Sequence, residues 1–113
     1  MRPLTPEETK EIQERCSDLS NFASDDIFSP IDPLTYVNPE GDTLLHIAAM
    51  RGDARTVELL IAAGADPNSL GDMGNTPLHY AFSNGGWDVA KILIDSGARE
   101  DIRNEFGRPP SRQ

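Results

Sequence analysis

The chain has 113 residues, a formal net charge of −9 and a single cysteine. This length suffices for one domain with a modest core, and the lone Cys16 excludes an internal disulfide framework. The acidic balance disfavours nucleic acid and anionic membrane surfaces, and no apolar run or leader peptide marks a membrane or secreted protein. We therefore expect a cytoplasmic protein whose partner has a basic or neutral surface.

The first expected element is a helix over residues 5–19. The run from Thr5 to Glu8 contains an N-cap threonine, a proline at the first helical position and a capping-box carboxylate. Ile12, Cys16 and Leu19 then recur at i, i+4 and i+7 and form one narrow apolar stripe. We expect this helix to cap the first unit that follows, with Cys16 as a buried structural thiol. A helix that docks into a groove of a partner is the alternative.

Residues 20–40 lose the helical period and collect serine, asparagine, aspartate and proline, which predicts a loop. The segment is too apolar for a free linker, so we expect it to lie against the units that follow. Its apolar residues are Phe22, Ile27, Phe28, Ile31 and Tyr36.

One sequence unit is written twice, at an offset of 33 residues. The run Gly41-Asp42-Thr43-Leu44-Leu45-His46-Ile47-Ala48 returns as Gly74-Asn75-Thr76-Pro77-Leu78-His79-Tyr80-Ala81, and the offset also carries Gly52 onto Gly85. A 33-residue period with Thr-Pro-Leu-His, a glycine after a short first helix and Leu-Leu-x-x-x-Gly-Ala closing a second helix resembles the ankyrin repeat. The resemblance covers about residues 38–108.

The resemblance implies an all-α solenoid in which helix-turn-helix pairs stack and are joined by β-hairpin loops. It implies complete repeats at residues 38–70 and 71–103 and a partial third repeat at residues 104–113. Residues 1–37 then form an N-terminal capping helix and covering loop of one compact domain.

Within the first repeat, we expect Thr43 to cap a helix that ends at Gly52, and Ala54 to Ala62 to form the second helix. The second repeat departs from this pattern. Gly86 is expected to lie in the first turn of its second helix and to weaken that turn. Trp87 is either a surface anchor for a partner or an aromatic cover for the outer edge of the repeat.

His46 and His79 are candidates for metal binding or catalysis, because histidine is the commonest metal ligand and general base. The resemblance implies instead that each ring bonds to the backbone of its own and neighbouring turns. Patterns such as CxxC, GxSxG and HExxH are absent from the sequence. We therefore expect no catalytic residue, no metal and no cofactor.

Ankyrin repeat proteins typically bind other proteins through hairpin tips and the exposed side of the first helices. Met50, Met73 and Phe106 would be apolar anchors among acids at these positions. The tip positions implied here are Pro39, Glu40 and Asp42, then Asp72, Met73 and Asn75, then Glu105, Phe106 and Arg108, and the helix positions are Met50, Arg51, Ser83 and Asn84.

The sequence therefore predicts a non-catalytic protein-interaction module. Its small size, its acidity and its individual N-terminal segment suit a dedicated inhibitor such as an immunity or antitoxin protein. An accessory or regulatory subunit of an enzyme complex is the alternative.

Overall fold

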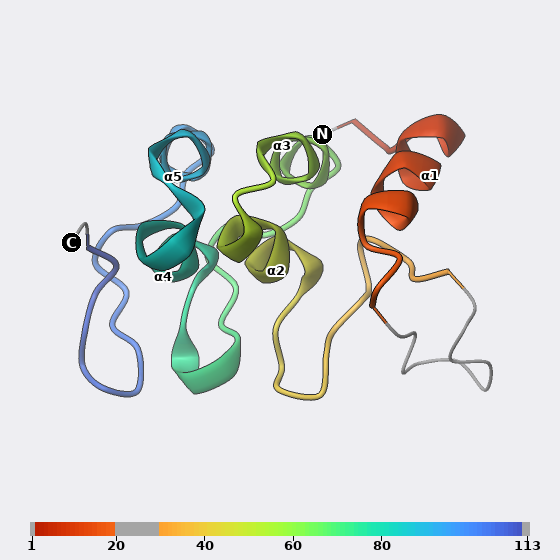
Figure 1. The fold of residues 1–113 in the computed structure, drawn as a ribbon. Coiled ribbons are helices and arrows are strands. Elements are labelled where there is room, and N and C mark those ends of the chain that lie inside the picture. Colours follow the sequence, from red (N-terminus) through yellow and green to blue (C-terminus); the bar gives the residue numbers. More distant parts are fainter. Residues whose placement is uncertain (1, 20–29, 112–113) are drawn as a thin grey trace.

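The computed structural model describes residues 2–19 and 30–111, which form stacked helix pairs joined by hairpin loops. Helices α1, α3 and α5 make one row, α2 and α4 make a second row beside it, and the hairpins project from the second row (Figure 1). The described ranges contain no strand beyond one isolated bridge, between Val37 and Thr43. The all-α solenoid is therefore confirmed. The helices are α1 (Pro6–Arg15), α2 (Leu44–Arg51), α3 (Ala54–Ala62), α4 (Pro77–Tyr80) and α5 (Trp87–Asp95), with a 3-10 helix η1 (Asp72–Gly74) and a π-helix η2 (Ala81–Gly85).

Helix α1 begins with the predicted capping box. The Thr5 hydroxyl accepts the main-chain N–H of Glu8 at 3.1 Å, and the Glu8 carboxylate accepts the main-chain N–H of Thr5 at 3.0 Å. The helix ends at Arg15, about one turn earlier than predicted, and the serine and aspartate that follow Cys16 are weaker helix formers than the glutamates and lysine within it. Ile12 and Cys16 are buried in the common core as expected.

Ion pairs also hold α1 against the first repeat. Glu11 accepts from Arg15 at 3.2 Å and from Arg55 of α3 at 3.1 Å, and Arg15 reaches Asp53 at 3.0 Å. Exposed pairs of this kind contribute little to stability, because water and salt screen them. They orient α1, while its apolar stripe supplies most of the packing.

The first repeat has the predicted helices and caps. The Thr43 hydroxyl accepts from the third residue of α2, and the helix ends at Gly52, whose φ of 69° is left-handed. Asp53 then caps α3, since its carboxylate accepts the main-chain N–H of Thr56 at 3.2 Å and the Thr56 hydroxyl at 2.6 Å.

The turn between the helices differs in the second repeat. Helix α4 continues into η2, and the N–H of Gly86 donates to the carbonyl of Ala81, five residues back, at 3.0 Å. Gly86 is left-handed, with a φ of 91°, and precedes α5, so the prediction that it lies in the first turn of that helix was wrong. Helix α5 has no side-chain cap, where α3 has Asp53.

An aromatic pair fills this altered turn. The rings of Phe82 and Trp87 stack, with centroids 6.4 Å apart and an interplanar angle of 21°. Trp87 covers Phe82 with one face and is still 50% exposed. The cover over the edge of the repeat, one of the two interpretations of Trp87, therefore agrees with its packing.

One continuous hydrophobic core runs from α1 to α5. It includes Ile31 and Tyr36, so the end of the predicted covering loop lies against the stack as expected. Phe22, Ile27 and Phe28 lie outside the described residues.

Candidate functional site

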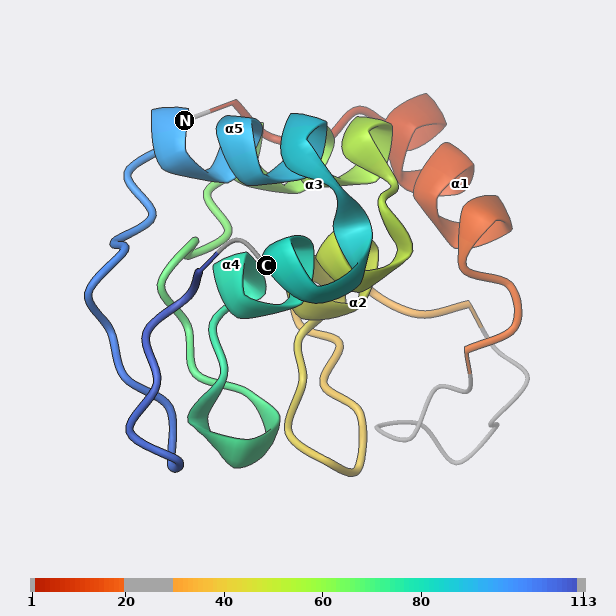
Figure 2. The same ribbon diagram turned by 60° about the vertical axis from the view of Figure 1, so that its left-hand side comes forward.

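Three equivalent hairpins stand side by side along one edge of the molecule (Figures 1 and 2). The same main-chain hydrogen bond recurs at the base of each hairpin. The bond joins Asn38 to Asp42 at 2.9 Å, Gly71 to Asn75 at 2.8 Å, and Asn104 to Arg108 at 2.9 Å. We define the hairpin edge as residues 37–42, 70–75 and 103–108.

The two histidines tie each repeat to the hairpin that follows it. His46 Nδ1 accepts the main-chain N–H of Thr43 at 3.1 Å, so Nε2 carries the proton and donates to the carbonyl of Asn75 at 3.0 Å. His79 repeats this arrangement one layer on and donates to the carbonyl of Arg108 at 2.9 Å. Both rings therefore serve the backbone. Burial lowers the pKa of His46, in keeping with this neutral form.

Asp42 is a link between repeats and not a free tip acid. It is 8% exposed, and its Oδ1 accepts the main-chain N–H of Asp72 and the hydroxyl of Tyr80, both at 2.9 Å. Gly71 makes room for this carboxylate, because a Cβ there would collide with Asp42 and lie 2.9 Å from His46 Nε2. Burial and the Asp42 carboxylate raise the pKa of Tyr80. The expectation that Asp42 is an exposed acid at a hairpin tip is therefore corrected.

The other predicted positions differ in how freely they face solvent. Asp72 and Asn75 are half-buried, and the Asn75 side-chain oxygen accepts the Asn104 amide at 2.9 Å. Arg51 is exposed but forms two hydrogen bonds with Asp18, at 3.1 and 2.6 Å. The exposed members of the predicted set are Pro39, Glu40, Met50, Arg51, Met73, Ser83, Asn84, Glu105, Phe106 and Arg108.

The third hairpin is held rigidly against the second. The side-chain oxygen of Asn104 accepts the main-chain N–H groups of Phe106 and Arg108, both at 3.0 Å. The main-chain N–H of Glu105 donates to the carbonyl of Met73 at 2.9 Å. The tip that carries Phe106 is thus preorganised, which lowers the entropy lost when a partner binds.

Met73 stands at a strained tip. Its φ is 56°, the only left-handed value for a non-glycine residue in the described ranges, and Gly74 after it is also left-handed. Asn38 and Asn104 accept N–H groups of their own hairpins, and Gly71 at the equivalent position has no side chain to do so. The second hairpin therefore has a different turn, whose left-handed Met73 costs about 1–2 kcal/mol.

Exposed apolar side chains concentrate on and beside the hairpin edge. Among the residues described, seven large hydrophobic side chains are exposed, and only Met50 and Trp87 of these lie on α-helices. Sequence reasoning missed Val37 and Leu70, although they are 33 residues apart and both precede the closing pair of a hairpin. The remaining five, between 48% and 67% exposed, are Leu34, Val37, Leu70, Met73 and Phe106.

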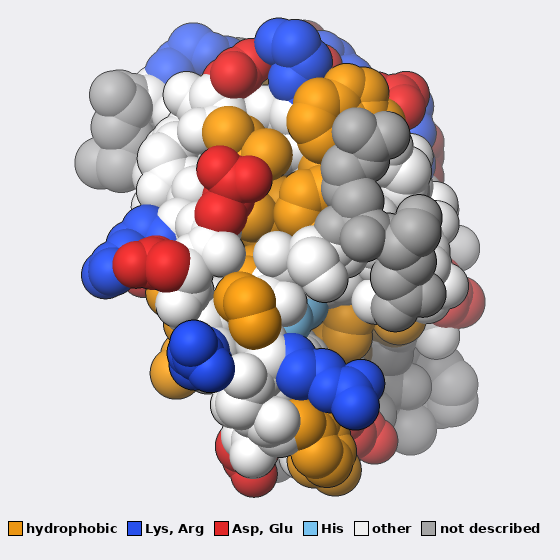
Figure 3. Space-filling view, turned by 90° about the vertical axis from the view of Figure 1, so that its left-hand side faces the viewer, with side chains coloured by type: hydrophobic (Ala, Val, Ile, Leu, Met, Phe, Trp, Pro, Cys, Tyr) orange, Lys and Arg blue, Asp and Glu red, His pale blue; other side chains and the backbone are white. Residues whose placement is uncertain are grey.

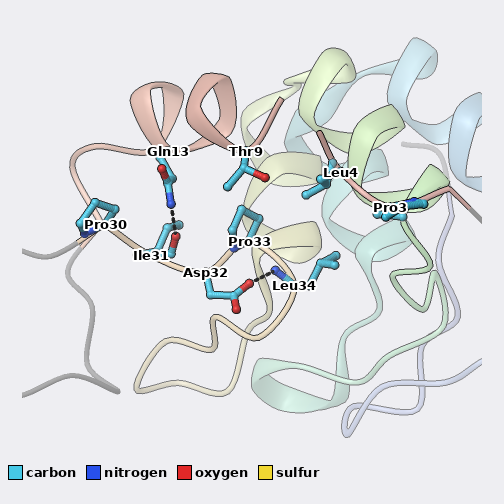
Figure 4. Close-up of a pocket in the computed structure, with 10 residues that line it drawn as sticks. Pro3, Leu4, Thr9, Gln13, Pro30, Ile31, Asp32, Pro33 and Leu34 are labelled. Atoms are coloured by element: carbon cyan, nitrogen blue, oxygen red, sulfur yellow. Dashed lines mark hydrogen bonds between the residues drawn. The ribbon is translucent and has the colours of Figure 1, made fainter. Parts of the chain in front are cut away.

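A groove near the N-terminus is a second candidate site (Figure 4). It has a volume of about 620 Å³. Two of its polar side chains already form hydrogen bonds within the chain. Gln13 donates to the carbonyl of Ile31 at 2.9 Å, and Asp32 accepts the N–H of Leu34 at 3.0 Å. The groove is lined by Pro3, Leu4, Thr9, Gln13, Pro30, Ile31, Asp32, Pro33, Leu34 and Ala63.

Two other features are absent from the described ranges. No group of three or more His, Cys, Asp or Glu side chains is placed there to hold a metal ion. No helix in those ranges is long and apolar enough to cross a bilayer.

Comparison with known proteins agrees with this geometry. The family model for ankyrin repeats, in three copies, matches residues 22–104 and so takes in part of the segment before the first hairpin. A search of curated proteins finds no match to the chain. Ankyrin repeats are protein–protein interaction modules, and the family is non-catalytic. On the match, the 33-residue period and the three equivalent hairpins, the chain belongs to the ankyrin repeat family.

Proposed function

We propose that this chain is a non-catalytic module that binds a protein partner through the hairpin edge and the exposed positions Met50, Ser83 and Asn84 on α2 and η2. The observation that carries the proposal is the concentration of exposed apolar side chains on and beside the three hairpins. Single exposed apolar residues are ordinary, but a set aligned along one edge marks an interaction surface.

Met73 and Phe106 form the desolvated centre of the proposed interface. They occupy the same position of successive hairpins, and their backbones are joined through Glu105. Glu40 occupies the equivalent position of the first hairpin, where it favours a partner with a basic or neutral surface and steers its approach. Nucleic acid, membranes and cofactors have no part in this proposal.

Within this function, the small size and acidity support a dedicated inhibitor such as an immunity or antitoxin protein. An accessory or regulatory subunit of an enzyme complex is the alternative. A cytoplasmic setting suits the single buried thiol. Residues 1–37 serve in this proposal as the cap and cover of the repeats at residues 38–70, 71–103 and 104–113.

Site-specific photo-crosslinking tests the proposal. A photoreactive phenylalanine analogue replaces Met73 or Phe106, with matched controls at Glu58 and Lys91, which are exposed on α3 and α5. We expect both tip positions to crosslink the same protein in the native cell and both controls to leave it uncaptured. Met73→Ala and Phe106→Ala should each weaken binding of that purified partner about tenfold or more. Capture at the controls alone, or binding that depends on Trp87 and not on the tips, would contradict the proposal.

A further inference from the structure

The basic side chains of this acidic chain divide into two kinds. Six of the nine that the structure describes form ion pairs with carboxylates of the same chain, at 2.6 to 3.2 Å. Lys10, Arg103 and Arg108 form none within the described residues. Two of these three belong to the third hairpin, so the free positive charge of the described surface gathers at one end of the hairpin edge.

The two arginines belong to the same hairpin as an exposed aromatic ring, that of Phe106. Phe106 is 67% exposed, the largest fraction among the large hydrophobic side chains described. Arg103 donates to the carbonyl of Gly107 at 3.2 Å, and the Arg108 backbone is held by Asn104. Viewed from the C-terminal end of the stack, hydrophobic side chains lie at the lower tip with acidic side chains beside them and basic side chains above them (Figure 3).

The single acid of this hairpin does not neutralise the arginines. Glu105 forms an ion pair with neither of them in the described structure. Its side-chain stem lies against the second hairpin, because a Cβ added at Gly74 would approach Glu105 Cγ to 3.3 Å. The opposite end of the edge carries Glu40 and no arginine or lysine of its own.

The net charge of −9 does not prevent an acidic group from binding at this hairpin. At physiological ionic strength the Debye length is about 8 Å, so distant acids are screened while groups in contact are not. An arginine that contacts a carboxylate makes charge-assisted hydrogen bonds, which are roughly twice as strong as neutral ones. The local side chains therefore decide which chemistry this hairpin accepts.

We propose that the third hairpin binds an acidic segment of the partner, in which carboxylates contact Arg103 and Arg108 and an apolar side chain covers Phe106. This inference rests on the proposed function, because it assigns a chemistry to one end of the same edge. The partner then lies with its acidic segment at the third hairpin and its basic or neutral surface at Glu40. The two ends of the edge thereby set the direction in which the partner docks.

Two synthetic peptides of about twelve residues test the inference against the full chain. Both carry the same leucines, but one has glutamate at every charged position and the other has lysine. We expect the glutamate peptide to shift the NMR amide signals of residues 103–108 and of Met73. Arg103→Glu with Arg108→Glu should weaken this binding about tenfold or more. The matched control, Lys10→Glu with Lys91→Glu, changes the net charge equally and should leave binding unchanged.

Three outcomes would overturn the inference: no amide shifts at millimolar glutamate peptide, equal binding to the arginine-reversed variant, or tighter binding of the lysine peptide at the same hairpin. The proposed function is judged separately by the crosslinked partner. Suppose that partner is captured at Met73 and Phe106, and its affinity is the same for the parent and for the variant with both arginines reversed. The acidic-segment inference then fails and the proposed function stands. If the tips capture nothing, the proposed function itself fails.

Discussion

Asp42 joins two repeats through one carboxylate oxygen, which accepts hydrogen bonds from Asp72 and Tyr80. The sequence places this residue at a hairpin tip, and its equivalent in the third hairpin, Arg108, is indeed exposed. Its burial depends on Tyr80, 38 residues away, and on the missing side chain of Gly71. Neither dependence is visible in the local pattern, so the repeat alone could not predict it.

Replacing Asp42 by alanine should lower the free energy of unfolding by about 1–3 kcal/mol, because a partly buried hydroxyl and an N–H lose their acceptor. Asp42→Asn keeps an acceptor oxygen and should recover part of the loss. Chemical denaturation measures both, with Glu40→Ala at the exposed tip of the same hairpin as the control, expected within about 0.5 kcal/mol of the parent. Equal stability of the Asp42 and Glu40 variants would show that the link is unimportant.

The neutral ring of His46 should make stability depend on pH. Its pKa in the folded state is lowered, so the unfolded chain takes up the proton first as pH falls below about 6.5. Stability is then lost as pH falls from about 6.5 to the folded pKa and is fully present above that range. Unfolding free energies measured at several pH values should show this slope in the parent and a smaller one in His46→Gln. An NMR titration that places the His46 pKa above 6.5 would contradict the prediction.

At the scale of elements, caps predicted helix boundaries well and turns poorly. Helix α3 has the predicted bounds, because Gly52 ends the preceding helix and Asp53 caps the new one. The second repeat offers two consecutive glycines, and only packing places the left-handed residue at Gly86. The left-handed conformation of Met73 could not be predicted from the sequence either, since methionine gives no signal for that conformation.

Met73→Asn should stabilise the second hairpin and weaken partner binding together. Asparagine tolerates the left-handed conformation better than methionine, so we expect a gain of roughly 0.5–1 kcal/mol in the free energy of unfolding. Loss of the apolar anchor should weaken the crosslinked partner about tenfold. Phe106→Asn is the matched control, because Phe106 lacks a positive φ and should show only the loss of binding. If the Met73 variant bound the partner as well as the parent does, Met73 would be strained without being part of the interface, and the prediction would be wrong.

At the scale of the whole molecule, the N-terminal helix completes the core. The period of 33 predicted the solenoid, and the stripe of Ile12 and Cys16 predicted the cap, because both patterns concern regular packing. The sequence did not predict which basic side chains of the molecule remain free. That depends on which charged groups pair across elements, and Glu11 with Arg55, 44 residues apart, is one such pair.

Ile12→Ala should lower the free energy of unfolding by about 2–5 kcal/mol if α1 belongs to the same cooperative unit as the repeats. Glu14→Ala, exposed on the same helix, is the control and should change little. Thermal melting with probes in both the helix and the repeats would show one shifted transition. Two separate transitions would mean that the cap melts independently.

The histidine bonds run in one direction along the stack. Each ring donates to the hairpin after it, His46 to the second and His79 to the third. The 33-residue sequence repeat ends before the hairpin whose carbonyl accepts from its histidine. A unit that contains all its own hydrogen bonds is therefore longer than the sequence repeat by one hairpin. A boundary drawn at residue 103, where the sequence period closes, would strand the proton of His79 without an acceptor. A fragment that satisfies the hydrogen bonds of the second repeat has to extend through Arg108. The third hairpin therefore completes the second repeat as well as beginning the third.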